Sequence, residues 1–168
     1  MFKKIEPQAL EQNVFSAIGQ QWMLITAGTG ERCNTMTASW GGLGVLWGKN
    51  VATAYIRPQR YTFGFVEDNA YFTLAFFGEE FRQALTFCGS ESGRNVDKVK
   101  ACGFTVREGL GGAPYFEQAQ VVLVCRKLYW HDLDPAHFLD DSIDGVHYPH
   151  KDYHRMFIGE IMEVLVKE

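Results

Sequence analysis

Residues 34–42 read Asn34-Thr35-Met36-Thr37-Ala38-Ser39-Trp40-Gly41-Gly42, a run of β-forming and small residues that ends in two glycines. Threonine and tryptophan favour extended backbone, and consecutive glycines permit a bend or a bulge where a strand ends. We therefore expect a strand over Thr35–Trp40 that bends at Gly41-Gly42. Further β-forming runs predict neighbouring strands at Met23–Ala27, Val51–Ile56, Tyr71–Phe77, Gln120–Leu128 and Met156–Val166.

Short helices are expected between these strands. Glu79–Cys88 places apolar side chains at helical spacing between two glycines, and Val96–Cys102 forms a second such group. Thr62 is expected to cap a turn that runs to Glu67. Antiparallel strands with short intervening helices, and without a regular βαβ alternation, favour a closed or split barrel over a doubly wound parallel sheet.

Length and composition point to one folded domain over residues 1–168, with 46% hydrophobic and 14% aromatic residues. The formal net charge of -4 argues against a nucleic-acid partner, because affinity for a phosphate backbone comes from clustered Lys and Arg. No stretch has the length and apolarity of a membrane span or a signal peptide. The four cysteines are widely spaced without a C-x-x-C motif, which predicts reduced thiols and a cytoplasmic location.

Residues 34–42 also suit a ligand cradle. Small side chains let backbone N–H and C=O groups reach a flat heterocycle, and Gly41 and Gly42 permit close approach. The alternative is a barrel corner that binds nothing, and composition alone favours the two interpretations equally.

Two loop-to-helix junctions carry the basic residues of a candidate anion site. Arg57-Pro58-Gln59-Arg60-Tyr61-Thr62 presents two guanidinium groups, a phenol and a hydroxyl where free helix N–H groups favour a phosphate. Ser92-Gly93-Arg94-Asn95-Val96-Asp97-Lys98 has a similar composition and would close the other side of the site. The alternatives are a solvated turn for the first segment and a capped, exposed helix for the second.

Other ligand and catalytic motifs are absent or incomplete. Residues 28–33 lack the last glycine of the dinucleotide fingerprint G-x-G-x-x-G, and no P-loop or nucleophile elbow occurs. His147, His150 and His154 suggest a metal alternative, but Tyr148-Pro149 interrupts helical spacing and no H-E-x-x-H is present. We therefore expect no metal site and assign no side chain a catalytic role.

Taken together and in this order, residues 34–41, 57–62 and 92–98 resemble the flavin reductase-like, FMN-binding split-barrel family, and most closely its flavoredoxin-like branch. The resemblance extends from Val14-Phe15 to Tyr153–Ile161, which is nearly the whole chain. It implies a mainly β fold with short helices, built as a six-stranded antiparallel split β-barrel. It also implies a homodimer with one FMN per subunit near the dimer interface.

The resemblance further implies roles for individual residues. The isoalloxazine would be lined by Asn34, Thr35, Met36, Thr37, Ala38, Ser39 and Trp40. The phosphate side would be served by Arg57, Arg60, Tyr61, Thr62, Ser92, Gly93 and Lys98. His154 would contact the flavin or the substrate.

The expected function is transfer of hydride or electrons from NADH or NADPH, through FMN, to a free flavin, an iron-sulfur protein or another acceptor. This makes the protein an NAD(P)H-dependent oxidoreductase whose expected partners are a second copy, a nicotinamide nucleotide, and a redox protein or free flavin. A non-enzymatic flavin-binding electron carrier is the main alternative, and a His-based metal-dependent enzyme is a third. Neither nucleic acid nor a membrane is an expected partner.

Overall fold

Ten strands and five α-helices are present in the computed structural model, which describes all residues 1–168. The strands are β1 (Phe2–Ile5), β2 (Met23–Gly28), β3 (Cys33–Ala38), β4 (Gly41–Leu46), β5 (Lys49–Ile56), β6 (Tyr71–Phe76), β7 (Val106–Glu108), β8 (Pro114–Phe116), β9 (Val121–Asp132) and β10 (Arg155–Lys167). The helices are α1 (Val14–Ser16), α2 (Tyr61–Asp68), α3 (Arg82–Ser90), α4 (Lys98–Ala101) and α5 (Asp141–His147).

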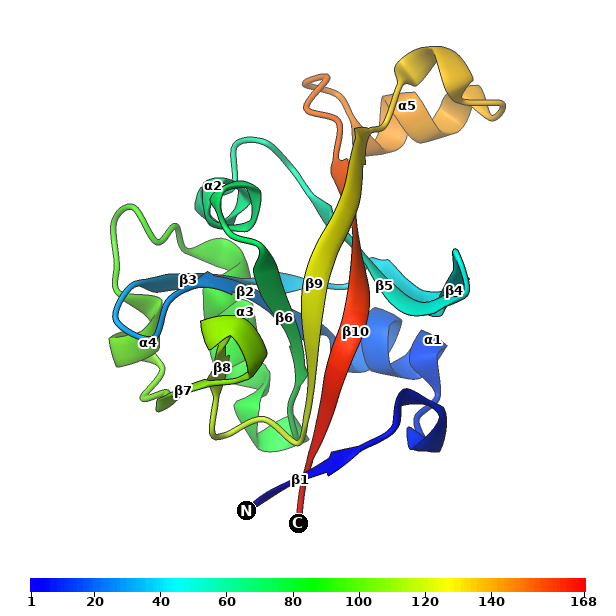
Figure 1. Cartoon of the computed structure of the whole chain (residues 1–168). Coiled ribbons are helices and arrows are strands. Elements are labelled where there is room, and N and C mark those ends of the chain that lie inside the picture. Colours follow the sequence, from blue (N-terminus) through cyan, green and yellow to red (C-terminus); the bar gives the residue numbers. More distant parts are fainter.

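Eight strands form one antiparallel sheet in the order β3-β2-β6-β9-β10-β5-β4, with β1 paired to the end of β10. The long strands β9 and β10 run side by side through the middle of the molecule (Figure 1). The end strands β3 and β4 are joined only by Ser39 and Trp40. A flat path across these strands would measure about 29 Å, whereas two residues bridge only about 10 Å. The sheet must therefore curl, and the predicted split-barrel class is confirmed.

The strand count differs from the six expected, because the main sheet has eight strands and β7 pairs with β8 in a second, two-stranded sheet. Two of the additional strands carry weak sequence signals. β1 contains Lys3 and Lys4, and β4 contains three glycines, which are depleted in strands. Pairing to long neighbours, rather than intrinsic preference, places these segments in the sheet.

The strand expected over Thr35–Trp40 ends two residues earlier, at Ala38. Gly41 begins β4 instead of forming the bend. A Cβ atom at Gly41 would lie 2.9 Å from both Met23 Cε and the Thr53 carbonyl oxygen. This glycine is therefore required by close packing of the strands, and the turn falls on the two residues before it.

Two apolar clusters hold the sheet and its helices together. One includes Phe72, Leu74 and Phe157, all fully buried, and the other includes Leu85 of α3 with stacked Phe104 and Phe116 rings 4.6 Å apart. β2 is buried along Met23–Ala27 without alternation. Burial on both faces explains its continuous apolar sequence.

The expected helix at Glu79–Cys88 is confirmed as a 3-10 turn, Glu79–Phe81, that leads into α3. The expected helix at Val96–Cys102 is shorter, because α4 covers only Lys98–Ala101. Asp97 caps it by accepting a hydrogen bond from the Lys100 amide at 3.0 Å.

The expectation that Thr62 caps a turn is wrong. α2 begins at Tyr61, so Thr62 lies inside its first turn, and Arg60 occupies the N-cap position without a side-chain cap. The buried Thr62 hydroxyl instead accepts a hydrogen bond from Asn34 Nδ2 at 2.7 Å. A tertiary contact with β3 thus replaces the local cap.

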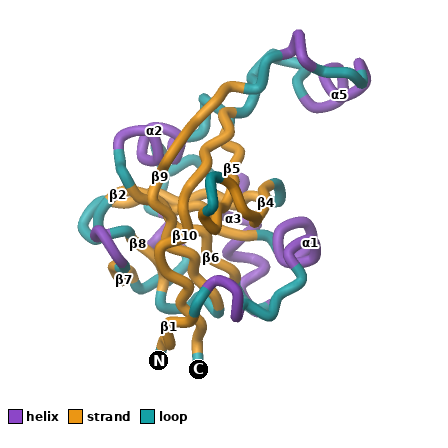
Figure 2. Tube along the Cα trace, turned by 45° about the vertical axis from the view of Figure 1, so that its right-hand side comes forward, coloured by secondary structure: helices purple, strands orange, loops and turns teal.

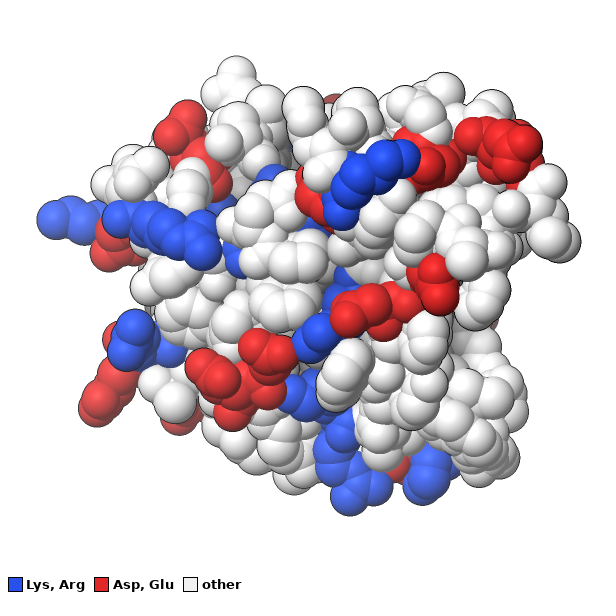
Figure 3. All heavy atoms as spheres, turned by 90° about the horizontal axis from the view of Figure 1, so that it is seen from above, with Lys and Arg blue, Asp and Glu red and all other residues white.

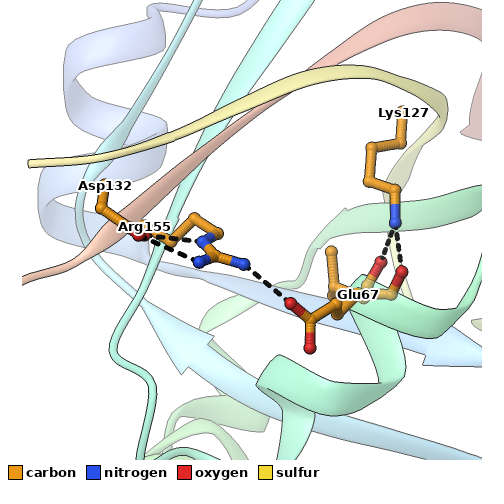
Figure 4. A network of polar contacts seen from close by, with 5 residues as sticks. Glu67, Lys127, Asp132 and Arg155 are labelled. Carbon is orange, nitrogen blue, oxygen red and sulfur yellow. Dashed lines mark hydrogen bonds and ion pairs between the residues drawn. The ribbon is translucent and has the colours of Figure 1, made fainter.

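The other end of α2 is tied to β9 and β10 by a polar network (Figure 4). Arg155 donates two hydrogen bonds to Asp132, at 2.6 and 3.0 Å, and one to Glu67 at 2.7 Å. Lys127 donates to the carbonyl oxygens of Val66 and Glu67 at 2.7 and 2.5 Å. A cation at the last carbonyls of a helix is electrostatically favourable, so this network fixes the position of α2.

α5 and its flanking loops project from the far ends of β9 and β10, away from the rest of the chain (Figure 2). Leu139 and Val146 in this lobe are exposed. On the face seen from above, acidic and basic side chains are interspersed rather than gathered into one basic field (Figure 3). None of the helices is long and apolar enough to cross a membrane.

Candidate functional site

A pocket of about 220 Å³ opens where β3 turns into β4. Three separate parts of the chain meet there: the end of β3 with its turn, the end of β5 with the segment after it, and the residue before β10. The lining residues are Met36, Thr37, Ala38, Ser39, Trp40, Tyr55, Arg57, Arg60 and His154. The antiparallel pairing of β5 with β10 brings these segments together.

A second hollow of about 120 Å³ adjoins the first. Its walls are the segment leading into α2 and the loop between α3 and α4. The lining residues are Gln59, Arg60, Tyr61, Thr62, Ser90, Glu91, Ser92, Gly93 and Lys98. Arg60 lines both hollows, so together they form one elongated site with its basic groups toward one end.

Arg60 and Lys98 supply positive charge to this site without a carboxylate partner. The Arg60 Nη2 atom is buried and has no hydrogen-bond partner. Lys98 is only 4% exposed, and its Nζ donates to the carbonyl oxygens of Thr35 and Cys88, both at 2.8 Å. Buried charge of one sign is costly unless a counter-charge is bound. The site therefore suits an anion.

Burial shifts the titration of both groups. It lowers the pKa of Arg60, with a further contribution from the nearby Arg57 charge. It lowers the pKa of Lys98 from 10.5 to about 8. Between these values the unfolded chain binds more protons than the folded one, so the unliganded fold gains stability as pH rises above about 8. Below that pH the buried ammonium lowers the stability of the unliganded protein.

Arg57 is placed differently from Arg60. Its guanidinium pairs with Asp152 at 2.6 Å and donates to the His147 carbonyl oxygen at 2.8 Å. It also lies over the Tyr148 ring, 5.1 Å from the centroid. Because its guanidinium is already paired with Asp152, Arg57 is better suited to hold the loop before β10 than to carry the main charge of an anion site.

Several hydroxyl and amide groups of β3 are committed to the fold. Thr35 is fully buried against Thr26 of β2, with 2.8 Å between their hydroxyl oxygens, and Thr37 donates to the Leu85 carbonyl oxygen. The Asn34 side-chain amide donates its hydrogen bond to the Thr62 hydroxyl. Strand β3 therefore offers the site mainly its backbone and the small side chains at its end.

His154 and Trp40 flank the opposite end of the site. Their ring centroids are 5.0 Å apart, and the Tyr148 hydroxyl lies 2.8 Å from His154 Nδ1. Burial, helped by the Arg57 charge, lowers the pKa of His154 to about 4. His154 is therefore neutral at pH 7. His147 packs on Trp40 as well, with ring centroids 5.3 Å apart, and no three His, Cys, Asp or Glu side chains gather in a group that could hold a metal ion.

The family model for the flavin reductase like domain matches residues 15–168. This chain belongs to that family. No curated protein matches the sequence.

Solved structures of similar fold accompany this family assignment. An FMN-binding protein from Thermus thermophilus is 22% identical, with a TM-score of 0.69 over 99% of this chain and 82% of that one. A flavoredoxin from Methanosarcina acetivorans is 21% identical, with a TM-score of 0.68 over 99% and 75%. An NADH:FAD oxidoreductase from Streptomyces globisporus is 15% identical, with a TM-score of 0.66 over 88% and 75%. At these identities the likeness establishes the fold alone.

In this member of the flavin reductase like family, the three predicted segments converge from β3, the start of α2 and the loop before α4. Tyr55 lines the site but was not among the predicted residues. Its only sequence signal is its place in the strand ahead of Arg57, and its orientation depends on the pairing of β5 with β10.

Gly93 provides a direct test of the close approach between the α3–α4 loop and β3. A Cβ atom there would lie 2.0 Å from Asn34 Oδ1 and 2.9 Å from Tyr61 Cδ1. We expect Gly93→Ala to displace Asn34 and lower the free energy of unfolding by about 1–3 kcal/mol, as measured by urea denaturation. The matched control is Gly64→Ala in α2, where nothing lies within 4 Å and helix propensity should raise stability by about 0.5–1 kcal/mol. Equal effects of the two substitutions would contradict this packing.

Proposed function

We propose that this protein binds FMN in the elongated site and transfers hydride or electrons from a nicotinamide nucleotide to a flavin, an iron-sulfur protein or another acceptor. The observation that carries the proposal is the buried, unpartnered Nη2 of Arg60, next to Lys98, whose ammonium is buried and forms hydrogen bonds to carbonyl oxygens but no ion pair. A terminal phosphate supplies the negative charge and the acceptor oxygens that these two groups lack.

The residues around the basic end fit a phosphate. Charge-assisted hydrogen bonds from Arg60 and Lys98 would hold its oxygens, and the hydroxyl of Ser92 lies on the same wall. Because Gly93 has no side chain, the backbone of the α3–α4 loop can come close to a bound phosphate. This donor set supports Arg60, Lys98, Ser92 and Gly93 as the phosphate anchor, with Tyr61 and Thr62 in supporting positions.

The larger pocket fits a planar ring system. Ala38 and Ser39 leave the backbone accessible, and the rings of Trp40 and His154 provide flat apolar surfaces beside it. Because His154 is neutral, it would contact a ligand without adding a charge. We propose that these residues receive the isoalloxazine.

A bound flavin supplies the redox chemistry, namely acceptance and release of hydride or electrons. The chain itself binds and orients. Arg60 and Lys98 would fix the phosphate, the end of β3 would place the ring edge against backbone polar groups, and Trp40 with His154 would limit access to one end. In this proposal no side chain of the site has to accept or donate a proton.

Loss of either buried cation should weaken FMN binding. We expect Arg60→Met to cost about 1.5–3 kcal/mol, a roughly tenfold to hundredfold rise in Kd, as measured by quenching of FMN fluorescence. Lys98→Met should have an effect in the same direction. Arg107→Met is the control, because Arg107 forms an exposed ion pair with Glu117 outside the site. Unchanged Kd in both site variants would remove the phosphate assignment.

The pH dependence separates Lys98 from Arg60. Free Lys98 has a pKa of about 8, and a bound anion raises that pKa. FMN affinity should therefore be constant between about pH 7 and 8, where the FMN phosphate is a dianion, and fall above pH 8 by at most about tenfold per pH unit. The same titration in Lys98→Met should be flat over this range. In Arg60→Met the slope should remain but begin at a higher pH, because the Arg60 charge contributes to the lowered pKa of Lys98. A slope that survives in Lys98→Met would assign the titration to another group.

The choice between a reductase and an electron carrier depends on the nicotinamide step. We expect anaerobic mixing of the FMN-bound protein with NADH or NADPH to bleach the visible flavin absorbance within the time of a catalytic turnover. Reduction only by a partner redox protein would instead support the flavoredoxin-like carrier. Heat-released flavin mixed with the same nucleotide is the control for uncatalysed reduction.

We also propose a homodimer that forms through an exposed apolar patch, which we define as Val45, Trp47 and Tyr129. These side chains are 43–74% exposed, and the Trp47 and Tyr129 rings are 6.1 Å apart. Exposed apolar patches of this kind mark protein interfaces. Light scattering should give the mass of a dimer, and Val45→Arg should shift it toward monomer while Leu110→Arg, outside the patch, should not. A monomeric protein at micromolar concentration would contradict this.

The four cysteines carry no disulfide. Free thiols are typical of reducing compartments, which supports the cytoplasm as the site of the proposed reaction.

A further inference from the structure

Two thiols lie at the two ends of the segment that carries the proposed phosphate anchor. Cys88 is in the last turns of α3, and Cys102 directly follows α4. Their sulfur atoms are 3.8 Å apart although the residues are 14 positions apart in the sequence. Ser92, Gly93 and Lys98 all lie between them, so a bond between these sulfurs would close a covalent ring around the anchor.

Lys98 is hydrogen-bonded to the backbone of both cysteines of this pair. Its Nζ donates to the Cys88 carbonyl oxygen at 2.8 Å, and its own carbonyl oxygen accepts from the Cys102 amide at 3.0 Å. A bond that restricts the movement of Cys88 and Cys102 would therefore also restrict the movement of Lys98, the buried cation of the site.

The other cysteines lack this arrangement. Cys125 is fully buried and Cys33 is half-buried, and the Cys88–Cys102 contact is the one sulfur–sulfur contact in the structure. A disulfide needs about 2.05 Å between sulfurs. Rotation of the two side chains would have to bring the sulfurs closer by less than 2 Å.

We propose that Cys88 and Cys102 are a redox-sensitive thiol pair whose disulfide tightens the cofactor loop and slows release of the bound flavin. The existence of the pair stands on the geometry alone, whereas its effect on flavin release rests on the proposed FMN site. A cross-link reduces the freedom of the loop that must open for the ligand to leave.

The chemistry uses hydrogen peroxide as the oxidant. The Cys102 sulfur, the more accessible of the two, attacks one peroxide oxygen, which breaks the O–O bond and yields a sulfenic acid and water. The Cys88 sulfur then attacks the Cys102 sulfur, and the hydroxyl leaves as a second water with the Cys88 proton. Two thiols lose two electrons in total, and one peroxide gains them. A small dithiol reverses the reaction by exchange.

Burial sets the rate of the first step. It raises the pKa of Cys88 to about 12 and raises that of Cys102, although the Lys98 charge acts in the opposite direction on both. The reactive thiolate is therefore scarce at neutral pH, so the pair should resist brief oxidation and respond to sustained or mildly alkaline exposure. Once Cys102 is oxidised, the neighbouring Cys88 closes the bond without a diffusional encounter.

The experiment treats the FMN-loaded protein with hydrogen peroxide and maps its peptides by mass spectrometry without reduction. We expect one cross-linked species joining the Cys88 and Cys102 peptides, reversed by dithiothreitol. FMN dissociation from the oxidised protein, followed by recovery of flavin fluorescence on dilution, should be slower by about threefold or more.

Matched variants separate the parts of the proposal. Cys88→Ser and Cys102→Ser each keep the backbone contacts to Lys98 and should abolish both the cross-link and the slowing, whereas Cys125→Ala should keep both. Absence of the cross-link in protein that circular dichroism shows to be folded would overturn the thiol pair. A complete cross-link with unchanged FMN dissociation would overturn the control of release. Failure of the reduced protein to bind FMN would instead overturn the proposed function, and the cross-link would still be decided by the peptide map.

Discussion

Positive charge buried without a neutralising carboxylate is the interaction on which the site depends. Arg60 and Lys98 lie at the junction of β3, α2 and α4, and the fold supplies only neutral carbonyl oxygens to Lys98 and none to Arg60 Nη2. Such an arrangement lowers the stability of the unliganded protein. A ligand that brings negative charge recovers that free energy, so affinity and fold stability are linked through the same two side chains.

The rest of the structure holds these cations in place. α2 is fixed at one end by the Asn34–Thr62 hydrogen bond and at the other by Arg155 and Lys127. Strand β3 is fixed by its pairing with β2, and its carbonyl at Thr35 receives Lys98. The curl of the sheet then brings the β3–β4 turn against the start of β10. Rigid elements thus surround a site with a basic end and an aromatic end. Because these two ends lie apart, the site favours an elongated ligand that is anionic at one end and planar at the other.

Sequence patterns predicted the parts of the fold that depend on local preference. The apolar runs of β2, β6 and β9 and the helical spacing of α3 lie where they were expected. β2 and β6 are buried along nearly their whole length, β9 is buried in its first half, and α3 buries the face that carries Leu85 and Cys88. The edge strands β1 and β4 were not expected, because lysine and glycine have low strand propensity and these segments become strands only by pairing with their neighbours. Thr62 was misassigned as a cap for a similar reason: its hydroxyl is used by Asn34, which is 28 positions away. In the site, the three segments could be found from residue type and order, but the neutralisation of Arg57 by Asp152 depends on a long-range contact that composition does not reveal.

The same binding machinery suits either a reductase or a carrier, because the chain's residues orient the ligand and leave electron transfer to the flavin. In the proposed binding mode, access to the ring distinguishes the two, because the ring would lie at the end of the site formed by Trp40 and His154. This end is bounded by the loop from α5 to β10, where Arg57 forms an ion pair with Asp152 and donates a hydrogen bond to the His147 carbonyl oxygen. Arg57 thereby links this end of the site to the projecting lobe. In the proposed binding mode, the projecting lobe would influence which electron donors and acceptors reach the ring, whereas the cationic end would retain the cofactor. The two ends differ in sequence and in packing, so they can change independently within one barrel.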